Sequence, residues 1–196
     1  MRSTLTLLAL LAIAFLAPAE AQQAAKLDAA ATEATLATKP PGRIKYRGPA
    51  SPVRKRTYTR NTRGLEVEIV EMQDGRKEER PYVAIPILFV RAQAELLDTV
   101  SKENLKELGE ILKRLTTADP KAKFTIQGHT SAEGARDANV SLSHLRADRI
   151  YRTLVTAGVP EGSLSRVGFG PDWATAEATA LEAELQKDRR VLVVRD

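Results

Sequence analysis

Apolar residues in the second half of the chain recur with the spacing of a helix. Between residues 102 and 117, five of them fall three or four positions apart or side by side: Leu105, Leu108, Ile111, Leu112 and Leu115. This spacing predicts an amphipathic helix with Ser101 as its N-cap. Asp119-Pro120 is expected to end it, because proline cannot continue a helix.

A second helix and four short strands complete the pattern. The helix is expected over residues 135–157, since Gly158 follows as a C-terminal stop. Alternating or mainly apolar runs predict strands at residues 87–90, 124–127, 166–170 and 190–194. The resulting β-α-β-α-β-β order predicts an α/β sandwich, with helices packed on one side of a mixed β-sheet.

An extended segment precedes these elements. Residues 65–69 alternate strictly between apolar and charged, and Asp74-Gly75 supplies a turn typical of hairpins. Pro81 and Pro86 lack the amide hydrogen that a central strand needs, so they confine the second run to a sheet edge or to short pieces. We therefore expect a small β-ribbon at residues 64–84 and one folded domain at residues 85–196.

The N-terminal region differs from the rest in composition and charge. Residues 1–21 have a basic start, an apolar run and a small-residue exit, which predict a secretory signal peptide. Residues 22–63 contain ten Lys or Arg and two Asp or Glu, in a chain whose net charge is only +5. Few large apolar residues occur there, so this segment is expected to be a flexible basic linker.

Two absences limit how the chain is held in place. It has no Cys, so neither disulfides nor the acylated cysteine of a lipoprotein are available. No segment has the roughly 18 uninterrupted apolar residues of a transmembrane helix. The mature chain is therefore expected to be exported, soluble and without a transmembrane span.

The most specific pattern lies between the second strand and the second helix. Residues 128–134 read Gly-His-Thr-Ser-Ala-Glu-Gly and are followed at fixed spacing by Asn139, Leu142-Ser143 and Arg146-Ala147. The run resembles the signature of the OmpA-like (outer-membrane protein A C-terminal) peptidoglycan-binding domain. That signature reads G-H-T-D-x-x-G, followed by the same later residues.

Two further motifs extend the resemblance to residues 85–195. Residues 168–170 resemble the family's G-x-G strand end, and residues 188–191 resemble its N-R-R-V close, with Asp188 in place of the asparagine. The resemblance implies an OmpA-like sandwich that binds peptidoglycan non-covalently in the periplasm, in association with the outer membrane. It implies no enzymatic activity and no cofactor.

The family also implies which residues form the site. Its loop aspartate and its helix arginine together hold the ammonium and carboxylate of diaminopimelate in the cell-wall peptide. By position, Arg146 would hold the carboxylate, Asn139 and Thr130 would orient the loop, and Arg189 would add positive potential. On an ideal helix, Asn139 and Arg146 lie within about 20° of each other and roughly 10 Å apart along the axis, so they share a face.

This sequence departs from the family at two places in the site. Ser131 stands where the family has the aspartate, and residues 89–92 keep only Phe89 of its F-D-x-N segment. A hydrogen bond to a charged group contributes about 1.5 to 3 kcal/mol, against about 1 kcal/mol for a neutral pair. The affinity for diaminopimelate is therefore expected to fall about tenfold unless Glu133, two residues later, supplies the missing charge.

Other kinds of site are disfavoured. His129, Glu133 and His144 lack the helical spacing or the further ligands that a metal site needs. No G-x-S-x-G turn supports a serine hydrolase, and few aromatic residues accompany the basic segment, which argues against nucleic-acid binding.

Two alternatives stay open. Arg146 could pair with a loop carboxylate or a backbone carbonyl while Asn139 caps the signature loop, in which case both are structural. In the second alternative, the domain has lost wall binding and docks another envelope protein as a structural or interaction module.

Overall fold

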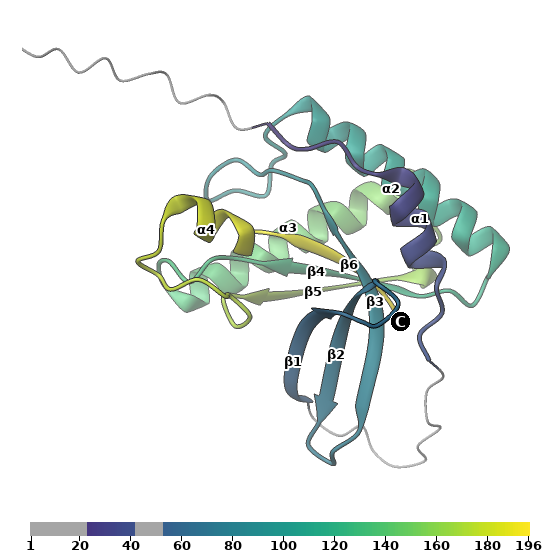
Figure 1. Cartoon of the computed structure of the whole chain (residues 1–196). Coiled ribbons are helices and arrows are strands. Elements are labelled where there is room, and N and C mark those ends of the chain that lie inside the picture. The colour runs from purple at the N-terminus through teal and green to yellow at the C-terminus, as the bar shows by residue number, and fades with distance from the viewer. Residues whose placement is uncertain (1–22, 42–52) are drawn as a thin grey trace, which may run out of the picture.

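One six-stranded mixed β-sheet runs through the protein, whose computed structural model describes residues 23–41 and 53–196 (Figure 1). Its strands lie in the order β1-β2-β3-β6-β4-β5, and only β4 and β5 are parallel. The strands are β1 (Val53–Arg60), β2 (Glu66–Met72), β3 (Lys77–Ile85), β4 (Phe124–His129), β5 (Leu164–Gly170) and β6 (Val191–Arg195). The helices are α1 (Ala29–Ala37), α2 (Thr99–Ala118), α3 (Arg136–Thr156), the short 3-10 turn η1 (Glu161–Ser163) and α4 (Glu182–Asp188).

The two long helices, α2 and α3, cover one face of the sheet, which confirms the expected mixed α/β class (Figure 1). Their apolar sides form one core with inward residues of β4, β5 and β6. The largest members of this core are Leu105, Leu108, Ile111, Leu112, Phe124, Ile126, Ile150 and Leu154. Removing so much apolar surface from water favours folding by about 25 cal/mol per Å², which is why these helices follow their sequence periodicity closely.

The start of α2 differs from the expectation in its capping residue. Asp98 is the N-cap, and its carboxylate accepts a hydrogen bond from the Ser101 amide at 2.7 Å. Ser101 lies inside the helix instead, where its hydroxyl accepts a bond from the Leu88 amide at 2.9 Å. The prediction that Ser101 caps the helix is therefore wrong. Its hydroxyl instead binds the Leu88 amide, in the segment that leads into the helix.

The strand expected at residues 87–90 is also absent. Phe89 makes only an isolated bridge to Leu96, and the Ile87 amide bonds to the Ile85 carbonyl in a tight turn. The strand that precedes α2 is β3, and it changes partner along its length. Its first half pairs with β2 as far as Pro81, and its second half pairs with β6 from Tyr82 onward.

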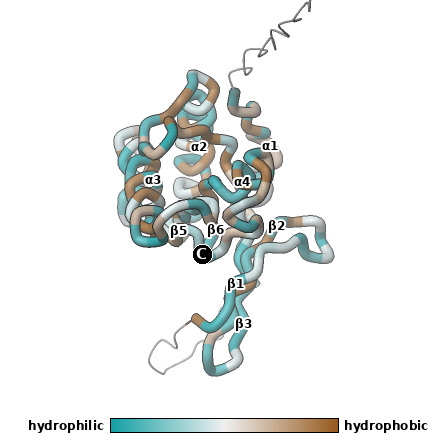
Figure 2. Tube along the Cα trace, turned by 90° about the vertical axis from the view of Figure 1, so that its left-hand side faces the viewer, coloured by the Kyte–Doolittle hydropathy of each residue, from teal (hydrophilic) through white to brown (hydrophobic). Residues whose placement is uncertain are grey.

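This change of partner explains how a proline fits inside the sheet. Pro81 lies where pairing with β2 ends and pairing with β6 begins, so its missing amide hydrogen interrupts neither ladder in the middle. The hairpin of β2 and β3 turns at Asp74-Gly75 as expected, with Gly75 at φ +83. It is continuous with the main sheet, and Figure 2 shows it extending away from the helices with mostly hydrophilic or intermediate residues.

Residues 22–63 are not a flexible linker throughout, because two parts of them are folded. α1 packs on α2 and buries Leu36 completely, and the Leu27 amide bonds to the Asn104 side chain at 2.8 Å. β1 pairs with β2 along its length, with a buried ion pair between Arg56 and Glu68. Leu36 gave too weak a local signal, since the elements that α1 contacts, α2 and β3, lie far away in the sequence. The expected signal peptide, and residues 42–52 of the expected linker, lie outside the described residues.

Candidate functional site

The signature loop leaves the end of β4 and leads into α3, and glycines let this helix lie directly on the strands. A Cβ on Gly128 would lie 2.3 Å from the Ser143 carbonyl oxygen, and one on Gly168 would lie 2.3 Å from the His144 amide nitrogen. The Ser143 hydroxyl accepts a bond from the Gly170 amide at 2.8 Å. Much of the signature therefore fixes the helix against the sheet and does not face a ligand.

Arg146, on α3, packs against the turn that precedes α2. Its guanidinium lies 4.7 Å from the centre of the Phe89 ring, and its Nε donates to the Gln93 carbonyl at 3.0 Å. The side chain is 6% exposed, and burial, followed by the charge of Arg189, lowers the pKa of Arg146 to about 10. It is therefore still a cation at pH 7.

No carboxylate of residues 23–41 or 53–196 forms an ion pair with Arg146. A buried cation without an acidic partner is costly, and a bidentate bond to a carboxylate is the interaction that best satisfies a guanidinium. The contact to the Gln93 backbone carbonyl is the one that the structural alternative for Arg146 predicts, but it uses only the Nε. Arg146 thus has the chemistry of a carboxylate-binding group.

Arg189 differs, because carboxylates surround it. Its Nη2 bonds to Glu133 at 2.5 Å and its Nη1 bonds to Glu182 on α4, while its Nε donates to the Ser131 hydroxyl at 3.2 Å. The hydrogen bond to Glu182, and then that to Glu133, raises the pKa of Arg189. Arg189 therefore organises the loop, and the structure brings Ser131, Glu133 and Arg189 together beside Arg146.

Asn139 and Thr130 hold the loop from within. The Asn139 side-chain amide donates to the Glu133 carbonyl at 2.5 Å, as the structural alternative for this residue predicts. Thr130 is 2% exposed, and its amide bonds to the Gly170 carbonyl at 3.0 Å. Both positions support the loop that presents Ser131 and Glu133.

Sequence reasoning missed three contributors. Gln93 acts through its backbone carbonyl, so no side-chain pattern could have signalled it. Glu182 lies on α4, between β5 and β6, and reaches the site only through the fold. Ala92 has a left-handed backbone with φ 57, which strains a non-glycine residue in the turn that carries Gln93.

Neither a metal site nor a membrane span is found in the part of the chain that the structure describes. No three His, Cys, Asp or Glu side chains of these residues gather closely enough to hold a metal ion. None of their helices combines the length and apolar character needed to cross a bilayer.

Comparison with known proteins decides the family. Residues 88–188 match the sequence profile of the OmpA family, and this stretch is 101 of the 196 residues. The chain belongs to the OmpA family. Domains of this family that bind peptidoglycan are non-enzymatic.

Individual relatives match part of the chain. The peptidoglycan-associated lipoprotein of Haemophilus influenzae is 33% identical over 76 residues, which are 39% of this chain and 49% of that protein. The probable lipoprotein YiaD of Escherichia coli is 33% identical over 70 residues, or 36% of this chain and 32% of that protein. The chain thus matches half or less of these relatives.

A solved structure agrees with the fold. The periplasmic domain of Helicobacter pylori MotB has a TM-score of 0.50 and 19% identity, covering 71% of this chain and 87% of that one. At this identity the likeness concerns the fold alone. The OmpA-like sandwich expected from the sequence is confirmed.

Proposed function

We propose that this protein binds the peptide stem of peptidoglycan non-covalently in the periplasm and so links the cell envelope to the wall. In this proposal Arg146 binds the carboxylate of diaminopimelate. One observation carries the proposal: Arg146 is more than nine-tenths buried and charged at neutral pH, and it has no carboxylate partner among the described residues. Membership of the OmpA family and the relatives called peptidoglycan-associated lipoproteins support the same ligand.

Glu133 is proposed to take the role of the missing aspartate. Its carboxylate lies 3.5 Å from the Ser131 hydroxyl, and its side chain stays 40% exposed while it bonds to Arg189. A carboxylate has about four acceptor positions, so Glu133 can receive the ammonium of diaminopimelate without releasing Arg189. The cation and anion that an amino-acid group requires are then supplied by Arg146 and Glu133.

Co-sedimentation with diaminopimelate-containing sacculi tests the wall-binding proposal. Arg146→Ala should weaken binding at least about 30-fold, because truncating one partner of a buried charge pair costs about 2 to 5 kcal/mol. Arg152→Ala is the matched control, since Arg152 lies exposed on the same helix and pairs only with Asp148 among the described residues. Thermal melting of each variant separates lost binding from lost folding.

Equal pelleting of Arg146→Ala and Arg152→Ala would overturn the proposal. It would favour the second candidate, a domain that docks an envelope protein, which the uncharged Ser131 makes reasonable. Deleting residues 22–63 would remove α1 and β1. The basic segment is therefore better tested by replacing Arg43, Lys45 and Arg47 with alanine, and these changes should leave sacculus binding largely intact.

A further inference from the structure

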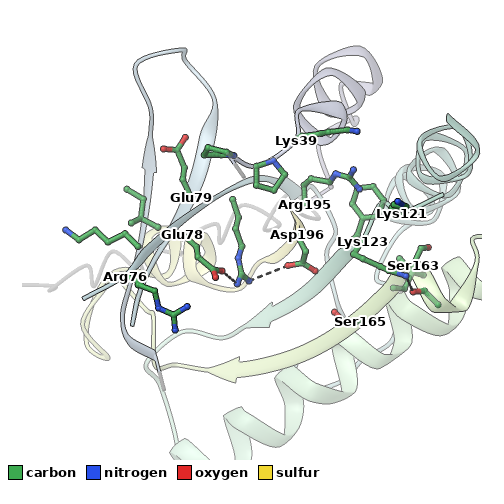
Figure 3. Close-up of a pocket in the computed structure, with 18 residues that line it drawn as sticks. Lys39, Arg76, Glu78, Glu79, Lys121, Lys123, Ser163, Ser165, Arg195 and Asp196 are labelled. Carbon is green, nitrogen blue, oxygen red and sulfur yellow. Dashed lines mark hydrogen bonds and ion pairs between the residues drawn. The ribbon is translucent and has the colours of Figure 1, made fainter. Parts of the chain in front are cut away.

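Two hollows in the described part of the chain differ in how their charged residues are paired. The first is a groove of about 1070 Å³ at the starts of β4 and β5, at the opposite end of these strands from the signature loop (Figure 3). Each arginine that lines this groove has an acidic partner: Arg76 pairs with Asp74, Arg80 with Glu78 and Asp196, and Arg195 with Asp119. The charge of these arginines is thus balanced within the protein.

The second hollow is a pocket of about 220 Å³ between α2, α3 and the turn that precedes α2, which we call the interhelical pocket. Its lining consists of Glu95 and Leu96 from the turn, Lys102 and Leu105 from α2, and Arg149 and Thr153 from α3. Leu96 and Leu105 are buried, whereas Lys102 and Arg149 are exposed. The pocket therefore combines an apolar wall with two accessible cations.

Neither cation of this pocket has an acidic partner among the described residues. The side chains of Lys102 and Arg149 form no ion pair and no hydrogen bond there, not even with Glu95. Asp98 lies close enough to Lys102 to be affected by its charge, but the Asp98 carboxylate already accepts bonds from two backbone amides, at 2.7 Å each. With Glu95 counted, the pocket carries a net positive charge and can attract an anion.

The interhelical pocket adjoins Arg146 through two elements. In the turn, Phe89, over whose ring the Arg146 guanidinium lies, pairs with Leu96 in an antiparallel bridge. Residues paired in this way have Cβ atoms about 4.5 to 5.5 Å apart on one face, so the pocket wall at Leu96 lies beside the Phe89 ring. On α3, Arg149 and Thr153 follow Arg146 by three and seven positions, which places them about one and two turns along a similar face. The pocket is therefore a neighbour of the proposed carboxylate site.

The size of the pocket indicates what kind of group it can hold. Sites for whole small ligands usually measure about 300 to 1,000 Å³, so 220 Å³ suits one residue or end group of a longer ligand. From Arg146 to Arg149, α3 rises only about 4.5 Å. Two residues of an extended chain span at most about 7 Å, so neighbouring groups of one peptide can reach both cations.

We propose that the interhelical pocket is a second carboxylate subsite for the stem peptide, with Lys102 and Arg149 as its cations. The inference rests on the proposed binding of diaminopimelate at Arg146 and extends it to the residue that follows in the stem. The C-terminal carboxylate of that residue lies between the two cations, while its side chain contacts Leu96 and Leu105. Because an amide end carries no charge, the pocket favours stems whose C-terminus is free over stems whose C-terminus is amidated.

Isothermal titration calorimetry with two peptides tests this proposal on the full chain. Both peptides are acetyl-Ala-diaminopimelate-Ala, and they differ only in having a free or an amidated C-terminus. At about 0.05 M salt the free acid should bind about fivefold more tightly, because ion pairs with exposed partners are individually weak, and higher salt should reduce the difference. In Lys102→Ala/Arg149→Ala the two peptides should bind equally. Lys106→Ala/Arg152→Ala, which removes the same charges from exposed positions of the same two helices, should keep the fivefold preference.

The acidic residue of the pocket gives a change in the opposite direction. Glu95→Gln removes a negative charge beside the bound carboxylate, so it should raise the affinity for the free acid about twofold and leave that for the amide unchanged. Equal binding of the two peptides by the original protein, or the same preference in Lys102→Ala/Arg149→Ala, would overturn the second subsite while leaving diaminopimelate binding at Arg146 intact. Failure of both peptides to bind would overturn the subsite together with diaminopimelate binding. Thermal melting should show no loss of folding in either double variant, because all four side chains are exposed.

Discussion

The inner and outer parts of the signature region use their polar residues in different ways. The inner part, where β4 and β5 meet α3, consists of glycines without room for a Cβ and of polar groups bonded to backbone, such as Ser143. The outer part carries Arg146, Glu133 and Arg189, whose charges are only partly matched. Most residues that match the family signature thus build the fold, whereas Ser131, which departs from it, lies in the part that would meet a ligand. A family match therefore says more about the scaffold than about its affinity.

The largest effect is expected in the inner part, at Gly168. Gly168→Ala would place a Cβ 2.3 Å from the His144 backbone nitrogen, so α3 must move off the sheet. We expect the free energy of unfolding to fall by about 3 kcal/mol or more, as measured by urea denaturation. Gly162→Ala is the control, because nothing lies within 4 Å of its Cβ position, and it should change stability by less than about 0.5 kcal/mol. Similar losses in both variants would show that the glycine contact is not what holds α3.

The next effect concerns pH and His129, which packs between Tyr58 and Phe169 with both ring nitrogens unpartnered among the described residues. Burial, and then the charges of Arg190 and Arg56, lowers the pKa of His129 to about 3, from 6.5 in the unfolded chain. Below pH 6.5 the unfolded chain binds a proton that the folded chain does not. The stability that neutral, buried His129 contributes is therefore fully present above pH 6.5. As the pH falls from 6.5 toward 3, the free energy of unfolding decreases by up to about 1.4 kcal/mol per pH unit.

His129→Phe should remove this pH dependence while keeping the aromatic packing. Between pH 7 and pH 5, the original protein should lose about 2 kcal/mol more stability than the variant in urea titrations. Parallel pH profiles for the two proteins would contradict a buried neutral His129.

A smaller effect, on binding and not on folding, is expected in the outer part. Glu133→Gln should weaken sacculus binding about tenfold, because a charged partner for the ammonium becomes a neutral one. Glu182→Gln, which alters the other carboxylate on Arg189, should weaken binding by less than about threefold, since Glu182 is not proposed to contact the ligand. Unchanged pelleting of Glu133→Gln would show that Glu133 does not replace the aspartate.

The smallest effect is expected in the strained turn that carries Gln93. Ala92→Gly should stabilise the protein by up to about 1 kcal/mol, because glycine adopts φ 57 without strain. Ala94→Gly, a nearby position without a positive φ, should instead destabilise it slightly. Thermal melting compares the two, and destabilisation by both would mean that the turn is not strained at Ala92.

Local patterns in the sequence determined the scaffold. The periodic apolar residues of α2 and α3, the turn at Asp74-Gly75 and the glycine-rich signature each act over a few neighbouring residues, so they could be recognised without a structure. They were sufficient to predict the α/β sandwich and its family. They also placed the candidate site at the end of β4.

Only the tertiary structure decided the rest, because the contacts involved join distant parts of the chain. α1 is held by α2, and β3 is held by both β2 and β6. Arg146 bonds to a carbonyl 53 residues away, and Glu133 meets Arg189 56 residues away. Whether a cation has an acidic partner depends on such long-range pairings, which the spacing of residues along the sequence does not predict.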